Sequence, residues 1–141
     1  MKRFKRLALA ACVILFALPV QTYGFQVRVS AYTNDPRCTK RIHPNTTASE
    51  HRITRKDYFH LIALSPQLAR HYRYGDVFIL KIGRDRYWVR YEDRMSSKIQ
   101  GRSDIDFLLP TMKKCFKFGI HRGDLILIHR PRKRAILALR K

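Results

Sequence analysis

"DVFILKIGRDRYWVRYED", residues 76–93, holds two apolar runs on either side of Gly83-Arg84-Asp85. A short connection that contains glycine between two such runs is typical of a β-hairpin. Alternate side chains of a strand point to opposite faces. In the second run one set is Tyr87, Val89 and Tyr91, and the other is Trp88, Arg90 and Glu92. The stretch therefore predicts two antiparallel strands with one face in a core.

Further short segments with an apolar face predict strands at 25–32, 58–65, 104–109 and 124–130. A helical turn is expected after Ser65, which precedes Pro66, and a short helix is expected to end at Gly119. The polar segment 33–57 is long for a structureless loop in a small domain, and such loops tend to be functional or mobile. About six short strands with one or two short helices predict a mainly β fold, a compact six-stranded barrel.

The first 24 residues have the pattern of a secretory signal peptide. Four cations stand at positions 2, 3, 5 and 6, an uncharged and mostly apolar run covers 7–20, and the small residues Thr22 and Gly24 follow. We therefore expect a signal peptide at 1–24, one domain at 25–130 and a basic tail at 131–141. The expected location is the periplasm or cell envelope. A retained N-terminal anchor and lipidation at Cys12 are the alternatives.

The chain is strongly basic, with a formal net charge of +20 over 141 residues. Such a charge attracts polyanions without specificity. For an exported bacterial protein, these are anionic envelope surfaces such as lipopolysaccharide and the carboxylates of cell-wall peptides. The charge would also permit nucleic-acid binding, but the signal peptide and the absence of a base-reading motif argue against it. A monomer is expected.

Cys38 and Cys115 are the cysteines that remain after the signal peptide. In an oxidising compartment such a pair often forms a disulfide, worth roughly 4 kcal/mol in the chain-entropy model. Two separate buried thiols are the alternative. The histidines show no metal-binding spacing and there is no CxxC or HExxH motif. We therefore expect neither a metal nor a cofactor.

Three carboxylates, Asp93, Asp104 and Asp106, stand close together in a chain that has only ten acidic residues. Asp104 and Asp106 are two positions apart in a predicted strand, so they point to the same face. Like charges that close raise a carboxyl pKa. The opposing interpretation is that they are rim charges paired with neighbouring arginines.

Several motifs occur in an order that resembles the 3D (three-aspartate) domain of cell-wall-active proteins such as membrane-bound lytic transglycosylase A. The matching positions are Ala31-Tyr32, Thr47-Ala48-Ser49, 62–66, Gly75, 93–101, Ile105-Asp106 and Phe118-Gly119. The resemblance covers residues 27–128. The chain departs from the pattern at Ser65, where the first of the three aspartates is expected, at Glu50 and within "DRMSSKIQG".

The resemblance implies a double-psi β-barrel with a groove for peptidoglycan. Lytic transglycosylases cleave the bond between N-acetylmuramic acid and N-acetylglucosamine. The sugar's own 6-hydroxyl attacks, so one carboxyl group can act as acid and then as base. We expect this acid to be Asp106, with Asp104 raising its pKa and Asp93 across the groove. Another alignment would place Asp104 in that role.

The resemblance also points to residues that would hold the glycan. Thr47 and Ser49 could bond to sugar hydroxyls or simply cap the loop, and Tyr32 and Trp88 could stack on sugar rings. Hydrolysis of the same bond is a related possibility. A non-catalytic peptidoglycan-binding module is the alternative function, because one family aspartate is missing.

Overall fold

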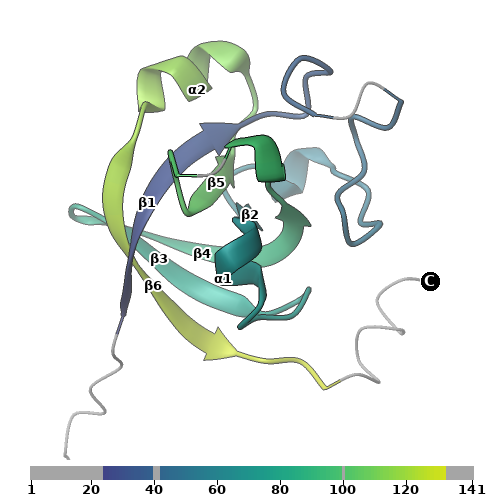
Figure 1. The fold of residues 1–141 in the computed structure, drawn as a ribbon. Coiled ribbons are helices and arrows are strands. Elements are labelled where there is room, and N and C mark those ends of the chain that lie inside the picture. Colours follow the sequence, from purple (N-terminus) through teal and green to yellow (C-terminus); the bar gives the residue numbers. More distant parts are fainter. Residues whose placement is uncertain (1–23, 40–41, 100, 133–141) are drawn as a thin grey trace, which may run out of the picture.

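The computed structural model describes residues 24–39, 42–99 and 101–132, and these form a small barrel (Figure 1). The predicted signal peptide and most of the predicted tail lie outside the described residues. The six strands are β1 (Phe25–Tyr32), β2 (Leu61–Leu64), β3 (Val77–Ile82), β4 (Asp85–Arg94), β5 (Ile105–Leu108) and β6 (His121–His129). The helices are α1 (Pro66–Ala69) and α2 (Met112–Phe118), with 3₁₀ turns η2 (Arg55–Asp57) and η3 (Ser97–Ile99).

The strands close into a barrel in the order β1-β5-β2-β4-β3-β6. The β1–β5 and β2–β4 pairs are parallel, and the other pairs are antiparallel. The predicted fold class is therefore confirmed: the protein is mainly β, a small closed six-stranded barrel with both parallel and antiparallel pairs and with two helices, one of them short. The expected hairpin at 76–93 is β3 and β4. The last strand begins at His121, three positions before the predicted start, because its first residues pair with β1.

The barrel interior is filled by alternate side chains of the strands, as the sequence pattern requires. It contains Val27, Val29, Ile62, Leu64, Phe78, Leu80, Val89, Tyr91, Ile105, Phe107 and Leu125. Phe107 meets the ring of Tyr87 at 5.0 Å and that of Phe118 at 6.0 Å, so α2 covers one end of this core. All six strands and their core lie between residues 25 and 129.

A second apolar cluster lies on the outside of the barrel, under the segment 33–60. Its members are Tyr32, Ile53, Leu61, Ala63, Met95 and Leu108, with Tyr58 packed against them. The long polar loop of the sequence is thus folded onto the barrel rather than free. A bridge between Thr46 and Arg52 and the η2 turn give it local structure.

Local sequence signals explain where the elements end. Gly83 has a φ of 59° in the β3–β4 turn and Gly119 a φ of 67° after α2, a region that favours glycine. Ser65 caps α1, because its side chain accepts a hydrogen bond from the Leu68 amide at 3.3 Å.

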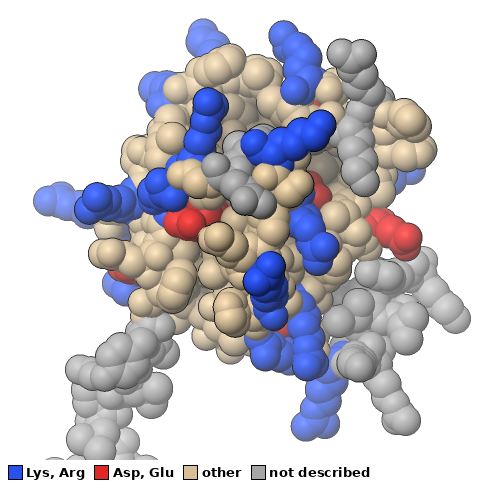
Figure 2. Space-filling view, viewed as in Figure 1, with Lys and Arg blue, Asp and Glu red and all other residues tan. Residues whose placement is uncertain are grey.

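An ion pair fixes the end of β6 to the loop before β3. The Asp76 side chain is completely buried, and its Oδ2 lies 3.0 Å from an Arg130 guanidinium nitrogen. Arg130 also donates to the His71 carbonyl oxygen at 3.3 Å. Lys and Arg side chains far outnumber Asp and Glu on the face seen in Figure 2. Within the described ranges, no helix has the length and apolar character needed to span a membrane.

Candidate functional site

Four residues on four neighbouring strands lie in one row across the outside of the barrel. Ser30 on β1 pairs with Asp106 on β5, Asp106 with Ala63 on β2, and Ala63 with Asp93 on β4. Neighbouring strands are about 4.8 Å apart, so the backbones of Asp93 and Asp106 are separated by roughly 10 Å. Because Ala63 has only a methyl side chain, the space between the two carboxylates is not filled by that strand.

A β-bulge brings Asp93 into this row. Ile62 pairs with Tyr91 but the next residue, Ala63, pairs with Asp93, so Glu92 is the extra residue in β4. A bulge reorients the side chains that follow it. With uninterrupted alternation in β4, Asp93 would follow Val89 and Tyr91 onto the core face.

Asp106 is held by two serine hydroxyls. Ser30 Oγ and Ser103 Oγ lie 2.6 Å apart. Ser30 donates to Asp106 Oδ1, and Ser103 Oγ lies 3.5 Å from the same oxygen. Burial raises the pKa of Asp106, the serine hydrogen bonds lower it, and the charge of Asp93 raises it; the net pKa is above the ordinary value. A carboxyl group in this setting can keep its proton at a higher pH than an exposed aspartate.

Asp104 is not among the groups that shift the pKa of Asp106. Asp104 Oδ2 accepts a hydrogen bond from the Arg28 amide at 2.7 Å and lies 3.9 Å from Arg28 Nε. It stands before β5 begins and lies at the rim beside this arginine, as the alternative interpretation proposed. The nearby charge that raises the pKa of Asp106 is that of Asp93.

Asp93 also anchors the loop that contains Thr47-Ala48-Ser49. Asp93 Oδ1 accepts hydrogen bonds from the amides of Ala48 and Arg94, each at 2.9 Å. The Ser49 amide donates to the Glu92 carbonyl oxygen at 3.1 Å. The loop is therefore attached to the strand that carries one of the two carboxylates.

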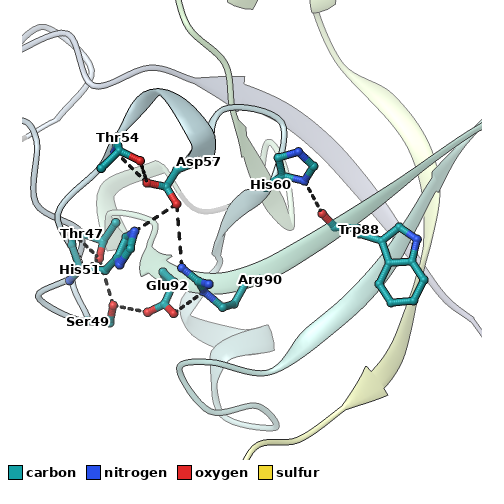
Figure 3. Close-up of polar contacts among 9 residues, drawn as sticks. All are labelled: Thr47, Ser49, His51, Thr54, Asp57, His60, Trp88, Arg90 and Glu92. Carbon is teal, nitrogen blue, oxygen red and sulfur yellow. Dashed lines mark hydrogen bonds and ion pairs between the residues drawn. The ribbon is translucent and has the colours of Figure 1, made fainter. Parts of the chain in front are cut away.

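Thr47 and Ser49 belong to a buried polar network and not to an open binding surface (Figure 3). Their hydroxyl oxygens lie 3.0 Å apart, and Ser49 Oγ donates to the Glu92 carboxylate. Glu92 in turn pairs with Arg90 at 2.7 Å. Their side chains are used within the protein, so of the two interpretations the loop-capping role is the one that the structure favours.

Asp57 completes this network from the η2 turn. It accepts hydrogen bonds from the amide and hydroxyl of Thr54 at 2.7 and 2.8 Å, and lies 3.1 Å from His51 Nε2. Burial alone would raise the pKa of Asp57, but the hydrogen bonds from Thr54 and His51 outweigh it and lower the pKa. The carboxylate therefore stays ionised and holds the loop closed.

The structure buries Tyr32 and exposes Trp88, although both were predicted to stack on sugar rings. Tyr32 is 7% exposed within the second apolar cluster, so its ring cannot stack on a sugar. Its buried hydroxyl makes no hydrogen bond of good geometry with a described residue, although Asp93 is close enough to interact with it. Burial, then Asp93, and then Asp106 raise the pKa of Tyr32 well above its usual range. Trp88 is 60% exposed, and at about 3.3 Å per residue it is roughly 16 Å along β4 from Asp93.

Cys38 and Cys115 are both free thiols in the structure. Cys38 Sγ contacts Met112 Sδ at 3.0 Å, and Met112 precedes Cys115 by one turn of α2. Burial, and then the nearby Cys38, raise the pKa of Cys115 to about 11. The predicted disulfide stays a prediction. Among the described residues, no group of His, Cys, Asp and Glu is arranged to hold a metal ion.

Two residues of the site were missed by the sequence reasoning. Ser30 had a signal, since it is a polar residue on the outward face of the first strand. Ser103 had none, because its burial depends on how the segment before β5 packs against β1. Comparison with known proteins gave no match to a family model and none to a curated protein.

Proposed function

We propose that this protein cleaves the glycosidic bond between N-acetylmuramic acid and N-acetylglucosamine in peptidoglycan, as a lytic transglycosylase or a related glycoside hydrolase. The observation that carries the proposal is the pair of partly buried carboxylates, Asp106 and Asp93, facing one side of the barrel in a single row. Their charges interact, and the pKa of Asp106 is raised by burial and by Asp93. Enzymes that cleave glycosidic bonds commonly use two carboxyl groups that lie in different environments.

In this mechanism Asp106 begins protonated. Its proton passes to the glycosidic oxygen as the bond from that oxygen to the anomeric carbon breaks. The Asp106 carboxylate then takes the proton of the 6-hydroxyl as O6 bonds to the anomeric carbon, which regenerates the acid and consumes no water. The ionised Asp93 would stabilise the positive charge that develops on the sugar ring. Ser30 and Ser103 hold Oδ1, which leaves Oδ2 for the substrate.

A hollow about 10 Å along the chain from Ser30 would accommodate neighbouring sugars. It has a volume of about 420 Å³ and lies beyond the ends of β1 and β5, next to Tyr32 and Leu108. Its lining is mostly polar: Thr33, Asn34, Asp35, Arg37, Pro110, Thr111, Met112 and Lys113. Hydroxyl-rich ligands need many hydrogen-bonding groups of this kind.

The departure at Ser65 leaves the carboxylate pair intact. Ser65 caps α1, and its amide donates to the Asp104 carbonyl oxygen at 2.9 Å. Aspartate and serine are about equally good helix caps. A serine here can therefore replace a structural aspartate without removing an acid from the row that contains Asp93 and Asp106.

The test is product analysis of purified peptidoglycan sacculi incubated with the protein. Release of 1,6-anhydro-muropeptides supports a lytic transglycosylase, and release of reducing-end muropeptides supports a hydrolase. The alternative, a non-catalytic module of the exported cell envelope, is favoured by the basic surface alone. Binding to sacculi without release of any product would support that alternative and contradict the proposal.

A further inference from the structure

A strip of three apolar side chains crosses the outside of the barrel over β4, β3 and β6; in it Trp88 is 60% exposed, Ile79 is half-buried and Ile126 is buried. Trp88 pairs with Ile79, and Ile79 pairs with Ile126. The neighbours Val89, Phe78 and Leu125 on the same strands point into the core, so the three strip residues point outward. Trp88 is the only tryptophan of the chain. Its ring points away from the polar network around Glu92 (Figure 3). We call this strip, with Lys81 and Arg86, the Trp88 face.

The next row on the same strands is mostly basic. Arg86 pairs with Lys81, which pairs with Asp124, and Arg84 lies in the adjoining turn. Within the described part of the chain, neither Lys81, Arg84 nor Arg86 forms an ion pair with a carboxylate. The acidic neighbours are Asp85 and Asp124. A hollow of about 160 Å³ opens next to this row, lined by Gln26, Lys81, Gly83, Arg122, Gly123 and Asp124. Two of its side chains are cations that could hold a phosphate group.

The chain enters the barrel beside this face. Gly24 packs so closely on β6 that a Cβ there would lie 3.0 Å from Asp124 Cβ and 3.2 Å from Ile126 Cγ1. β1 then starts next to β6 (Figure 1). In the sequence, the uncharged apolar run 7–20 ends four positions before Gly24. A retained N-terminal anchor, one of the alternatives for residues 1–24, would join the barrel at the edge of the Trp88 face.

We propose that the Trp88 face docks on the surface of an anionic phospholipid bilayer. The indole of Trp88 would lie at the level of the headgroups, where tryptophan is favoured because one end of its ring is apolar and the other polar. Lys81, Arg84 and Arg86 would face the lipid phosphates. Each cation near such a surface strengthens binding about fivefold.

The closed strand order places this face away from the candidate site. β3, at the centre of the Trp88 face, is separated from β5, which carries Asp106, by two strands in either direction around the barrel. A protein docked in this way would direct Asp106 away from the bilayer, whereas Asp93, which shares β4 with Trp88, lies roughly 16 Å along that strand from it. The inference does not depend on the proposed function, since it uses none of the residues of that site.

The experiment uses the full chain and its single tryptophan. Fluorescence is recorded with vesicles of equal parts phosphatidylglycerol and phosphatidylcholine, and with phosphatidylcholine alone, each with and without brominated acyl chains. We expect a blue shift and quenching of Trp88 by brominated lipid in the anionic vesicles. Arg86→Glu and Lys81→Glu should each weaken binding at least fivefold. Arg102→Glu, an exposed arginine just before β5, is the matched control and should change binding by less than twofold.

Two results would overturn the proposal. The chain could sediment with the vesicles while Trp88 is not quenched, which would mean that the N-terminal segment binds and this face does not. Alternatively, Trp88 fluorescence could respond to soluble muropeptides or chito-oligosaccharides and not to vesicles, which would make the face a glycan-binding surface. The quenching measurement needs only the wild-type chain, so misfolding of a variant cannot obscure it. Loss of glycan cleavage on changing Asp106 would leave this result unaffected.

Discussion

Asp93 and Asp106 lie in register on opposite sides of Ala63, one on β4 and the other on β5, with their side chains on the same outer face of the barrel. Ala63 contributes only a methyl group between them and is itself buried in the second apolar cluster, whose Tyr32 also interacts with both carboxylates. The charge of Asp93 therefore raises the pKa of Asp106 in addition to the effect of burial.

The raised pKa of Asp106 predicts a stability change with a defined pH dependence. Its contribution to stability is fully present below the ordinary aspartate pKa and is lost as the pH rises through the higher pKa of the folded state. Asp106→Asn removes an ionisation that the fold disfavours. We therefore expect its Tm to exceed that of the wild type at neutral pH, with the difference disappearing in acid. Thermal unfolding of both proteins at both pH values checks this. The prediction is contradicted if the Tm of Asp106→Asn, measured relative to the wild type, is lower at neutral pH than in acid.

Asp57 should show the opposite pH dependence. Its pKa is lowered, because the hydrogen bonds from Thr54 and His51 outweigh burial, so its contribution is present above the ordinary aspartate pKa and is lost as the pH falls through the lower folded value. Asp57→Asn should therefore cost about 1 kcal/mol at neutral pH, a typical capping contribution, and less in acid. Urea unfolding at the two pH values measures the difference. Equal losses at both would mean that the ionised form of Asp57 is not what holds the loop.

Tyr32 should behave as a core residue. Tyr32→Ala should cost about 3–5 kcal/mol, the usual loss when a large aromatic side chain is removed from a core. Tyr32→Phe should cost about 1 kcal/mol or less, because the hydroxyl makes no hydrogen bond of good geometry with a described residue. Urea unfolding of both variants gives the comparison. If Tyr32→Ala were as stable as the wild type, Tyr32 would not be a core residue, and its predicted role of stacking on a sugar ring would be favoured again.

The ion pair between Asp76 and Arg130 should contribute to the stability of the fold. Arg130→Ala leaves the buried carboxylate of Asp76 with the Arg73 amide as its remaining donor among the described residues, and because the Arg130 side chain is 41% exposed we expect a loss of about 1–3 kcal/mol. Arg132→Ala is the matched control, since Arg132 is exposed and should change stability by about 0.5 kcal/mol or less. Denaturant midpoints of the two variants test this. Similar midpoints would show that the buried pair contributes little beyond a surface charge.

The sequence predicted the strands better than it predicted how they pair. The hairpin at 76–93 follows from local alternation and from Gly83, whose positive φ suits a tight turn. The α1 cap follows from Ser65 and Pro66 in the same way. These features depend on neighbouring residues only, so they can be deduced without knowing the rest of the fold.

The site depends on pairing between distant segments, which local patterns do not specify. By alternation, Asp104 and Asp106 both fit an outward face of "DIDF". The pairing of β5 with β1 decides that Asp106 accepts a hydrogen bond from Ser30 and that Asp104 accepts one from the Arg28 amide. The alignment of Asp93 requires the bulge at Glu92, which has no sequence signal such as a glycine. The burial of Tyr32 results from the folded loop above it.

The most direct test of the central claim compares Asp106→Asn with Asp104→Asn on purified sacculi. The substitutions are chemically identical and two positions apart, but Asp106 belongs to the carboxylate row and Asp104 pairs with Arg28. Muropeptides released by each variant are identified by mass spectrometry, after circular dichroism has shown that both are folded. We predict that Asp106→Asn releases at least 100-fold less product than the wild type, the scale of a lost general acid, while Asp104→Asn stays within about threefold. Full activity in Asp106→Asn, or loss of activity in Asp104→Asn alone, would contradict the account.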